Sequence, residues 1–84
     1  MDSAFLKQKK VLVMGLGRFG GGADSAAFAA SRGAKVVVTD LADAEQLSDS
    51  IAQLKEYPDI EYHLAGHSEK DFQQADIVIV NPAV

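Results

Sequence analysis

Residues 10–20 read Lys-Val-Leu-Val-Met-Gly-Leu-Gly-Arg-Phe-Gly, and this stretch decides the fold. Its aliphatic run, Val11 to Met14, is typical of a parallel strand that is buried on both faces. A glycine-rich turn follows from Gly15 to Gly22, and an alanine-rich helical pattern comes next. A buried strand, a glycine-rich turn and a helix in this order predict the first βα unit of a Rossmann-like α/β domain.

The residues after this turn predict a helix that packs closely on a sheet. Gly33 stands where a C-terminal capping glycine belongs. Residues 35–39 then form a second buried strand, which ends at Asp40. The apolar stripe of the helix consists mostly of alanine, with Phe19, Ala23, Ala26, Ala27 and Ala30 at helical spacing.

The second half of the chain continues the alternation of helices and strands. Asp43 and Gln46 have the spacing of a capping box, and Pro58 marks the latest end of the helix that follows. Residues 60–64 predict a short strand, and residues 77–80 a last buried strand that Asn81 and Pro82 stop. A brief helical turn at 69–72 follows Ser68 as its cap. The stripe of the second helix is Ala44, Leu47, Ile51 and Leu54.

The expected order is therefore β-α-β-α-β-(short α)-β in a three-layer α/β domain. Strands that alternate with helices imply a parallel sheet with right-handed crossovers. The strand order 3-2-1-4 is the natural arrangement for this fold. Residues 1–84 suffice for one domain at most, and we expect it to be the N-terminal fragment of a larger protein.

Composition excludes several classes of function. The formal net charge is −4 and the basic residues are scattered, which disfavours nucleic-acid binding. Cysteine is absent, so no disulfide framework or thiolate metal site is expected. No apolar run approaches the roughly 20 residues that a membrane helix needs. These features fit a cytoplasmic protein that does not bind a membrane.

The glycine-rich turn has the chemistry of a phosphate site. Gly15 permits the tight turn, Gly17 lets a phosphate approach the backbone, and Gly20 lets the helix press against the strand. The alternative is a tight βα turn that binds nothing. Arg18 either pairs with a phosphate or is solvent-exposed. The additional glycines Gly21 and Gly22 loosen the first helical turn, which implies either that something comes close there or that the loop is mobile.

Asp40 is the best single candidate for a ligand contact. A carboxylate at the end of the second strand can accept hydrogen bonds from a ribose or a base N–H, and it would repel a 2′-phosphate. The alternative is a solvated turn aspartate. Asp24, in the first helical turn, more simply stabilises the helix dipole. We expect Phe28, off the apolar stripe, to be partly exposed or covered by a neighbouring domain.

No catalytic or metal site is expected in this chain. His63 and His67 lack further ligands at suitable spacing, so surface or loop histidines are the simpler interpretation. No nucleophile–base pair and no ATP-binding P-loop is visible.

Four stretches resemble the N-terminal domain of the Mur ligase that adds D-glutamate to UDP-N-acetylmuramoyl-L-alanine. The resemblance covers nearly the whole chain, and its closing Asn-Pro-Ala-Val string is similar to the Ser-Pro-Gly turn of the family. The stretches are residues 11–20, residues 32–40, Gly66-His67 with Asp71-Phe72, and residues 75–84.

The resemblance implies that this domain binds the UDP moiety of the substrate. It also implies that the domain belongs to a three-domain, cytoplasmic, monomeric ligase of peptidoglycan synthesis. The central domain would carry the ATP P-loop and the C-terminal domain would help bind the incoming amino acid, with ATP and Mg²⁺ used by the full-length enzyme. This chain alone would therefore bind no cofactor and would be inactive. The implied diphosphate contacts are Gly15, Gly17, Arg18, Phe19 and Gly20. The implied uracil and ribose contacts are Asp40, Leu41, Asn81, Pro82 and Ala83.

The chain departs from the family pattern at three positions. Phe19 replaces a frequent hydroxyl residue, Leu41 replaces a polar one, and Ala83 replaces a glycine. The glycine loop and Asp40 would equally suit an NAD-binding domain of a dehydrogenase or a nucleotide-sensing module. A domain that binds no nucleotide and only interacts with a partner is the third interpretation.

Overall fold

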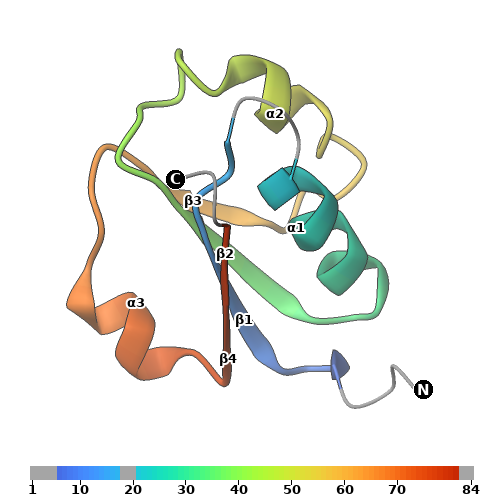
Figure 1. Ribbon diagram of the computed structural model, residues 1–84. Helices are drawn as coiled ribbons and strands as arrows, with labels where there is room; N and C mark the ends of the chain where they lie inside the picture. The colour runs from blue at the N-terminus through green and yellow to red at the C-terminus, as the bar shows by residue number, and fades with distance from the viewer. Residues whose placement is uncertain (1–5, 18–20, 82–84) are drawn as a thin grey trace.

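The structure, a computed structural model, describes residues 6–17 and 21–81, and it confirms the Rossmann-like α/β fold. Four parallel strands form one sheet in the order β3-β2-β1-β4, as the sequence predicts (Figure 1). The elements are β1 (Lys10–Met14), α1 (Gly21–Ser31), β2 (Lys35–Thr39), α2 (Ser48–Ala52), β3 (Glu61–His63), α3 (Glu69–Gln74) and β4 (Ile77–Val80).

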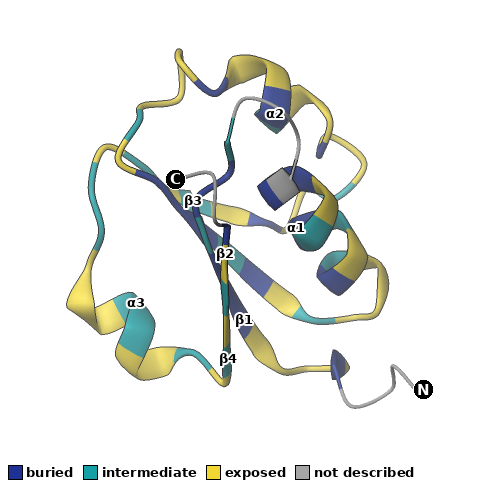
Figure 2. Ribbon diagram, in the orientation of Figure 1, coloured by how far each residue is buried: buried dark blue, intermediate teal, exposed yellow. Residues whose placement is uncertain are grey.

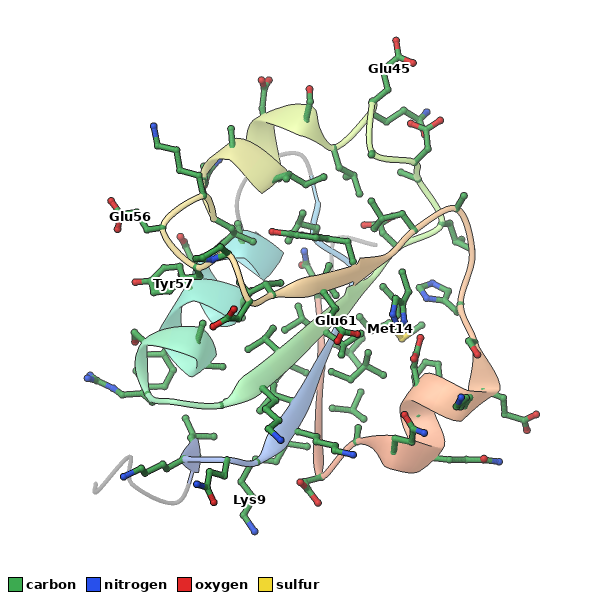
Figure 3. The ribbon with its side chains drawn as sticks, turned by 180° about the vertical axis from the view of Figure 1, so that it is seen from behind. Lys9, Met14, Glu45, Glu56, Tyr57 and Glu61 are labelled. Atoms are coloured by element: carbon green, nitrogen blue, oxygen red, sulfur yellow. The ribbon has the colours of Figure 1, made fainter. Side chains whose placement is uncertain are left out.

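The two faces of the sheet are covered unequally. Helices α1 and α2 lie over one face and α3 lies over the other (Figure 1). Val11 and Val38 belong to the buried core under α1, whereas no residue of α3 is buried (Figure 2). On the α3 side, β4 leaves Val78 and Val80 exposed. Charged side chains such as Lys9, Glu45 and Glu56 extend away from the body of the domain (Figure 3).

Helix α1 lies close to the sheet because its inner face is small. Ala23, Ala26 and Ala29 are buried there. Gly33 ends the helix as predicted: its φ is +87°, its N–H donates to the Ala30 carbonyl, and the next N–H reaches the Ala29 carbonyl. This pair of bonds is the Schellman arrangement. The predicted stripe is confirmed for its four alanines, whereas Phe19 lies outside the described residues.

The second helix is much shorter than the sequence predicts. The capping box forms, since Gln46 N lies 2.9 Å from Asp43 Oδ1 and Asp43 N lies 3.1 Å from Gln46 Oε1. However, the box closes a turn, and α2 begins only at Ser48. Turns with i→i−3 bonds flank the helix, and they include Ser48 N to Glu45 O and Leu54 N to Ile51 O. The prediction that Ala44 belongs to the apolar stripe is wrong, because Ala44 is exposed.

Smaller elements follow the prediction with shifted ends. Strand β3 is shorter than the expected 60–64, and α3 continues two residues past the expected 69–72. Ser68 occupies the N-cap position of α3, but its side chain makes no capping hydrogen bond. Phe28 is 52% exposed, with the Arg32 guanidinium 5.1 Å from its ring centre. No helix in the described part of the chain is long and apolar enough to span a bilayer.

Candidate functional site

The carboxyl ends of β1, β2 and β4 meet at one edge of the sheet, where the glycine-rich turn begins. Gly15 N donates to the Thr39 carbonyl at 2.7 Å, and Asn81 N donates to the Met14 carbonyl at 2.9 Å. Gly15 has a φ of +92° and Gly17 a φ of +73°, which alanine would adopt only with strain. The predicted role of Gly15 in the tight turn is therefore confirmed in its backbone conformation, whereas the approach of a phosphate to Gly17 stays a prediction.

Leu16 anchors the turn in the core. Its side chain is fully buried, and its N–H donates to Asp40 Oδ2 at 2.8 Å. Its carbonyl accepts the N–H of Gly22 at 3.2 Å, which starts helix α1. The turn is thus tied to the core, to the end of β2 and to the first turn of α1.

Asp40 is a buried structural carboxylate. It is 8% exposed, and its second oxygen, Oδ1, accepts the N–H of Ala42 at 2.9 Å. Its carbonyl accepts the N–H of Gly66 at 3.0 Å. The alternative of a solvated turn aspartate is therefore wrong. Contact with a ribose or base stays a prediction, for which each carboxylate oxygen retains a lone pair.

Ser50 reaches the turn from helix α2, and sequence reasoning missed it. The side chain is 1% exposed, and its hydroxyl donates to the Gly17 carbonyl at 2.5 Å. A signal was available, because position 50 falls on the apolar stripe of Leu47, Ile51 and Leu54. A polar residue on a buried stripe needs a hydrogen-bond partner, since an unpaired buried hydroxyl costs free energy.

The close approach that Gly22 implies is to the backbone of the turn. A Cβ atom at Gly22 would lie 2.7 Å from both Cα and the carbonyl oxygen of Leu16. At Gly17 an added Cβ would lie 2.9 Å from Asn81 Nδ2, so the buried Asn81 side chain fills the space beside this glycine. Gly20, from which we expect close packing of the helix start against the strand, lies outside the described residues.

The remaining predicted site residues are only partly described. Leu41 is 68% exposed at the rim of this edge, and Asp24 is exposed in the first turn of α1. Gly15, Gly17, Asp40 and Asn81 thus lie at the same edge of the sheet, where Asp40 bonds to Leu16 between the two glycines and Asn81 N bonds to the Met14 carbonyl. The other predicted contacts, Arg18, Phe19, Gly20, Pro82 and Ala83, lie outside the described residues.

The two histidines make different contacts on the α3 side. His63 Nδ1 lies 2.9 Å from both Asp71 carboxylate oxygens, and its Nε2 lies 3.4 Å from Glu61. The hydrogen bond with Asp71 raises the pKa of His63, and burial opposes this effect only in part. His67 Nδ1 lies 2.9 Å from the buried Thr39 hydroxyl. Across residues 6–17 and 21–81, no group of three or more potential ligands is arranged for a metal ion.

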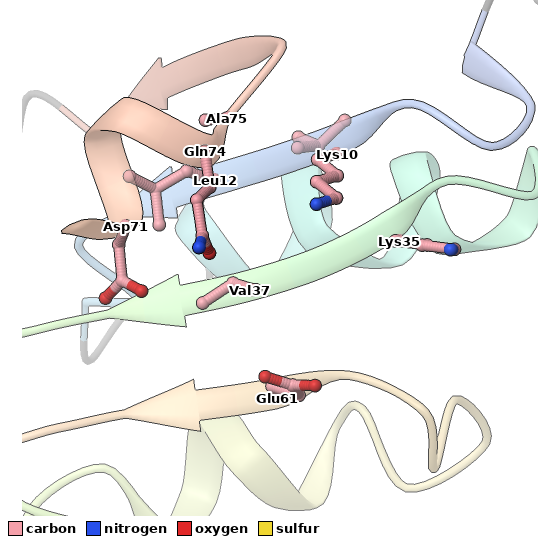
Figure 4. A pocket seen from close by; sticks show the side chains of 9 residues that line it. Lys10, Leu12, Lys35, Val37, Glu61, Asp71, Gln74 and Ala75 are labelled. Carbon is pink, nitrogen blue, oxygen red and sulfur yellow. The ribbon is translucent and has the colours of Figure 1, made fainter.

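Two cavities lie away from the glycine turn. The smaller, about 170 Å³, lies between the sheet and α3, where Lys10 and Lys35 stand near Glu61 and Asp71 (Figure 4). The larger, about 620 Å³, extends beside Tyr57 near the starts of β2 and β3. Neither includes a residue of the predicted site. We therefore base the candidate site on the turn itself.

Comparison with known proteins gives the same family throughout. Residues 9–84 match the family described as Mur ligase MurD-like, N-terminal domain. Similar curated proteins are named UDP-N-acetylmuramoylalanine–D-glutamate ligase. The protein of Treponema pallidum (strain Nichols) is 46% identical over 81 residues, 96% of this chain and 15% of its own length. That of Borreliella burgdorferi (strain ZS7) is 45% identical over 80 residues, 94% of this chain and 18% of its own. That of Roseiflexus sp. (strain RS-1) is 47% identical over 79 residues, which is 94% of this chain and 17% of its own length.

Proposed function

This chain belongs to the MurD-like N-terminal domain family of the Mur ligases, and from that premise we propose that it binds the UDP moiety of UDP-N-acetylmuramoyl-L-alanine. The observation that carries the proposal is the glycine turn, held at the carboxyl edge of the sheet by Asp40 and Ser50. In open α/β sheets ligands bind at this edge. The relatives that share this domain are named as ligases that join UDP-N-acetylmuramoylalanine and D-glutamate.

The turn suits a diphosphate for electrostatic and steric reasons. Helix α1 begins directly after it, and the N–H groups and dipole at a helix N-terminus attract anions. Gly17 brings no Cβ into the turn, and the side-chain nitrogen of Asn81 lies on the side where that Cβ would point. In this proposal the diphosphate lies along residues 15–20, with Arg18 as an additional cation.

The uracil and ribose would lie beside the ends of β2 and β4. Asp40 keeps acceptor capacity beyond its two backbone amides, and a uracil ring offers an N–H donor. Leu41 offers an exposed apolar surface next to it. In this proposal Asn81 with residues 82 and 83 completes the same side of the site.

The rest of the reaction would take place beyond this chain, which spans 15–18% of the length of the relatives described above. We propose that the chain is part of a longer, monomeric, cytoplasmic ligase of peptidoglycan synthesis, whose central domain binds ATP, whose C-terminal domain helps bind the incoming amino acid, and whose reaction uses ATP and Mg²⁺. The chain alone would hold the substrate without catalysing the ligation.

Calorimetric titration of the chain with UDP-N-acetylmuramoyl-L-alanine, and separately with NADH, tests the proposal. We expect heat of binding with the UDP ligand and none with NADH. Gly17→Ala should weaken UDP-ligand binding at least tenfold, because the added Cβ meets Asn81 and the positive φ is strained.

Gly33→Ala is the matched control. It places the same substitution at a similar positive φ, +87°, but at the opposite end of β2, against the flexible Lys7 side chain. Its binding should equal that of the wild type. Binding of NADH alone would favour the dehydrogenase or nucleotide-sensing alternative. Absence of binding to either ligand would count against nucleotide binding by this chain.

A further inference from the structure

Ser50 is a buried hydroxyl in a place where the fold itself does not need one. It lies on the inner face of α2, in the apolar stripe with Leu47 and Leu54, and is 1% exposed. Alanine at this position would continue the apolar face of α2 and would bury no hydroxyl that needs a hydrogen-bond partner. The neighbouring Ser48, at the start of the same helix, is exposed. The hydroxyl of Ser50 therefore has a local purpose, and its partner is the carbonyl of Gly17, 33 positions away in sequence.

The bond to Ser50 fixes the orientation of one peptide unit in the glycine turn. A peptide unit is planar, so holding its carbonyl oxygen sets the direction of the whole unit. Glycine has no Cβ, so its ψ is less restricted than that of other residues, and this unit can rotate about Gly17 if nothing holds it. A rotated unit would turn a carbonyl oxygen, which carries partial negative charge, toward the space where an anion binds.

Two other contacts hold the same turn but act on different atoms. Asp40 accepts the Leu16 N–H, and the Asn81 side chain lies against the Cα of Gly17. Ser50, by contrast, bonds to the Gly17 carbonyl oxygen.

We propose that Ser50 is a positioning residue for diphosphate binding: it orients the Gly17 peptide before the ligand arrives. The inference rests on the proposed function, since it concerns how the same turn receives a phosphate. Preorganisation of this kind raises affinity by removing the cost of ordering the turn on binding. The effect should be confined to the phosphate part of the ligand, because the Ser50 hydroxyl bonds to the glycine turn, whereas Asp40 is held by the amides of Leu16 and Ala42.

The test compares Ser50→Ala with Ser48→Ala, its matched control on the same helix, in titrations with UDP and with uridine. For Ser50→Ala we expect UDP affinity to fall about five- to tenfold, the effect of one lost hydrogen bond, while uridine affinity changes less than about twofold. Ser48→Ala should match the wild type with both ligands. Equal losses for UDP and uridine, or no loss for UDP, would overturn the inference.

A second measurement separates this inference from the proposed function. Hydrogen exchange by NMR, without ligand, reports the amides of Leu16 and Gly22 that bracket the turn. We expect both to exchange several-fold faster in Ser50→Ala than in Ser48→Ala. If the wild-type chain binds neither UDP nor uridine, the proposed function fails. Independently of that result, equal exchange rates in Ser50→Ala and Ser48→Ala would overturn the positioning role of Ser50.

Discussion

The packing of α1 against the glycine turn predicts that Gly22→Ala destabilises the domain. An alanine Cβ would lie 2.7 Å from Leu16 Cα and from the Leu16 carbonyl oxygen, and closer still to the Gly15 carbonyl oxygen. All three are backbone atoms of a turn that Asp40 and the core already hold. No flexible side chain can move aside, so the start of the helix or the turn must shift.

The expected loss of folding stability in Gly22→Ala follows from two opposing effects. Replacing a helical glycine by alanine stabilises by about 1 kcal/mol through helix propensity. Overpacking costs about 1–3 kcal/mol, and three contacts with a fixed backbone put this site at or above the upper end. We expect a net loss of about 2 kcal/mol, which would lower Tm by roughly 8–16 °C in a domain of this size. A chain of this length has a total stability of only about 4–12 kcal/mol, so the loss is a large fraction of it.

Thermal unfolding followed by circular dichroism measures this effect. Asp24→Ala is the control, because Asp24 is exposed in the same turn of α1 and its replacement should change stability by less than about 0.5 kcal/mol. If Gly22→Ala melts at or above the wild-type Tm, the first turn of α1 does not lie against the Gly15–Leu16 backbone, and the reasoning is refuted.

Two further predictions concern the His63–Asp71 pair and the exposed ring of Phe28. The Asp71 hydrogen bond raises the pKa of His63 above its ordinary 6.5, so the pair stabilises fully below about pH 6.5 and its contribution disappears as the pH rises through the raised pKa. His63→Gln should therefore lower the free energy of unfolding by about 0.5 kcal/mol at pH 5.5 and by nearly nothing at pH 8.5, as measured by urea denaturation. A loss that grows with pH would contradict this prediction. Phe28→Ala, at a half-exposed ring, should cost less than about 1 kcal/mol, whereas Leu54→Ala, at a side chain 2% exposed, should cost about 2–5 kcal/mol. Similar losses for the two variants would show that Phe28 is buried.

The strands and their order are predictable from local pattern. Val11 to Met14 and the valines of residues 36–38 form short apolar runs between glycine, aspartate and lysine, and such runs pair as buried parallel strands. The right-handed crossover rule then leaves few possible orders. Gly33 was equally predictable, because a positive φ at a helix end selects glycine.

The length of the second helix was not predictable in the same way. The capping box and the apolar stripe are both real, yet tight turns occupy residues 44–47 and 53–56 where a longer α-helix was expected. The segment must cross the end of the sheet and bring both Leu47 and Ser50 inward. Tertiary packing decides where a regular helix fits, and propensity alone does not contain that information.

The sequence predicts which residues form the candidate site, but it does not predict most of their hydrogen-bond partners. A glycine turn followed by an acidic residue at the end of the second strand predicts their proximity, and the Asp40–Leu16 hydrogen bond confirms it. That the carboxylate holds the protein's own backbone depends on the exact path of the turn. Ser50 comes from a helix 33 positions away, and pairing over such a distance is visible only once the fold is known.

The unequal covering of the sheet has a consequence for how the domain comes apart. The face under α1 is covered by a continuous apolar core, whereas α3 buries none of its residues, and its side-chain contacts include His63 with Asp71 and His67 with Phe72. Cooperative units of a protein open with free energies that follow their buried contacts. We therefore expect α3 to open at a lower free energy than the α1 side of the sheet, so that it can detach while the strands and the glycine turn stay folded.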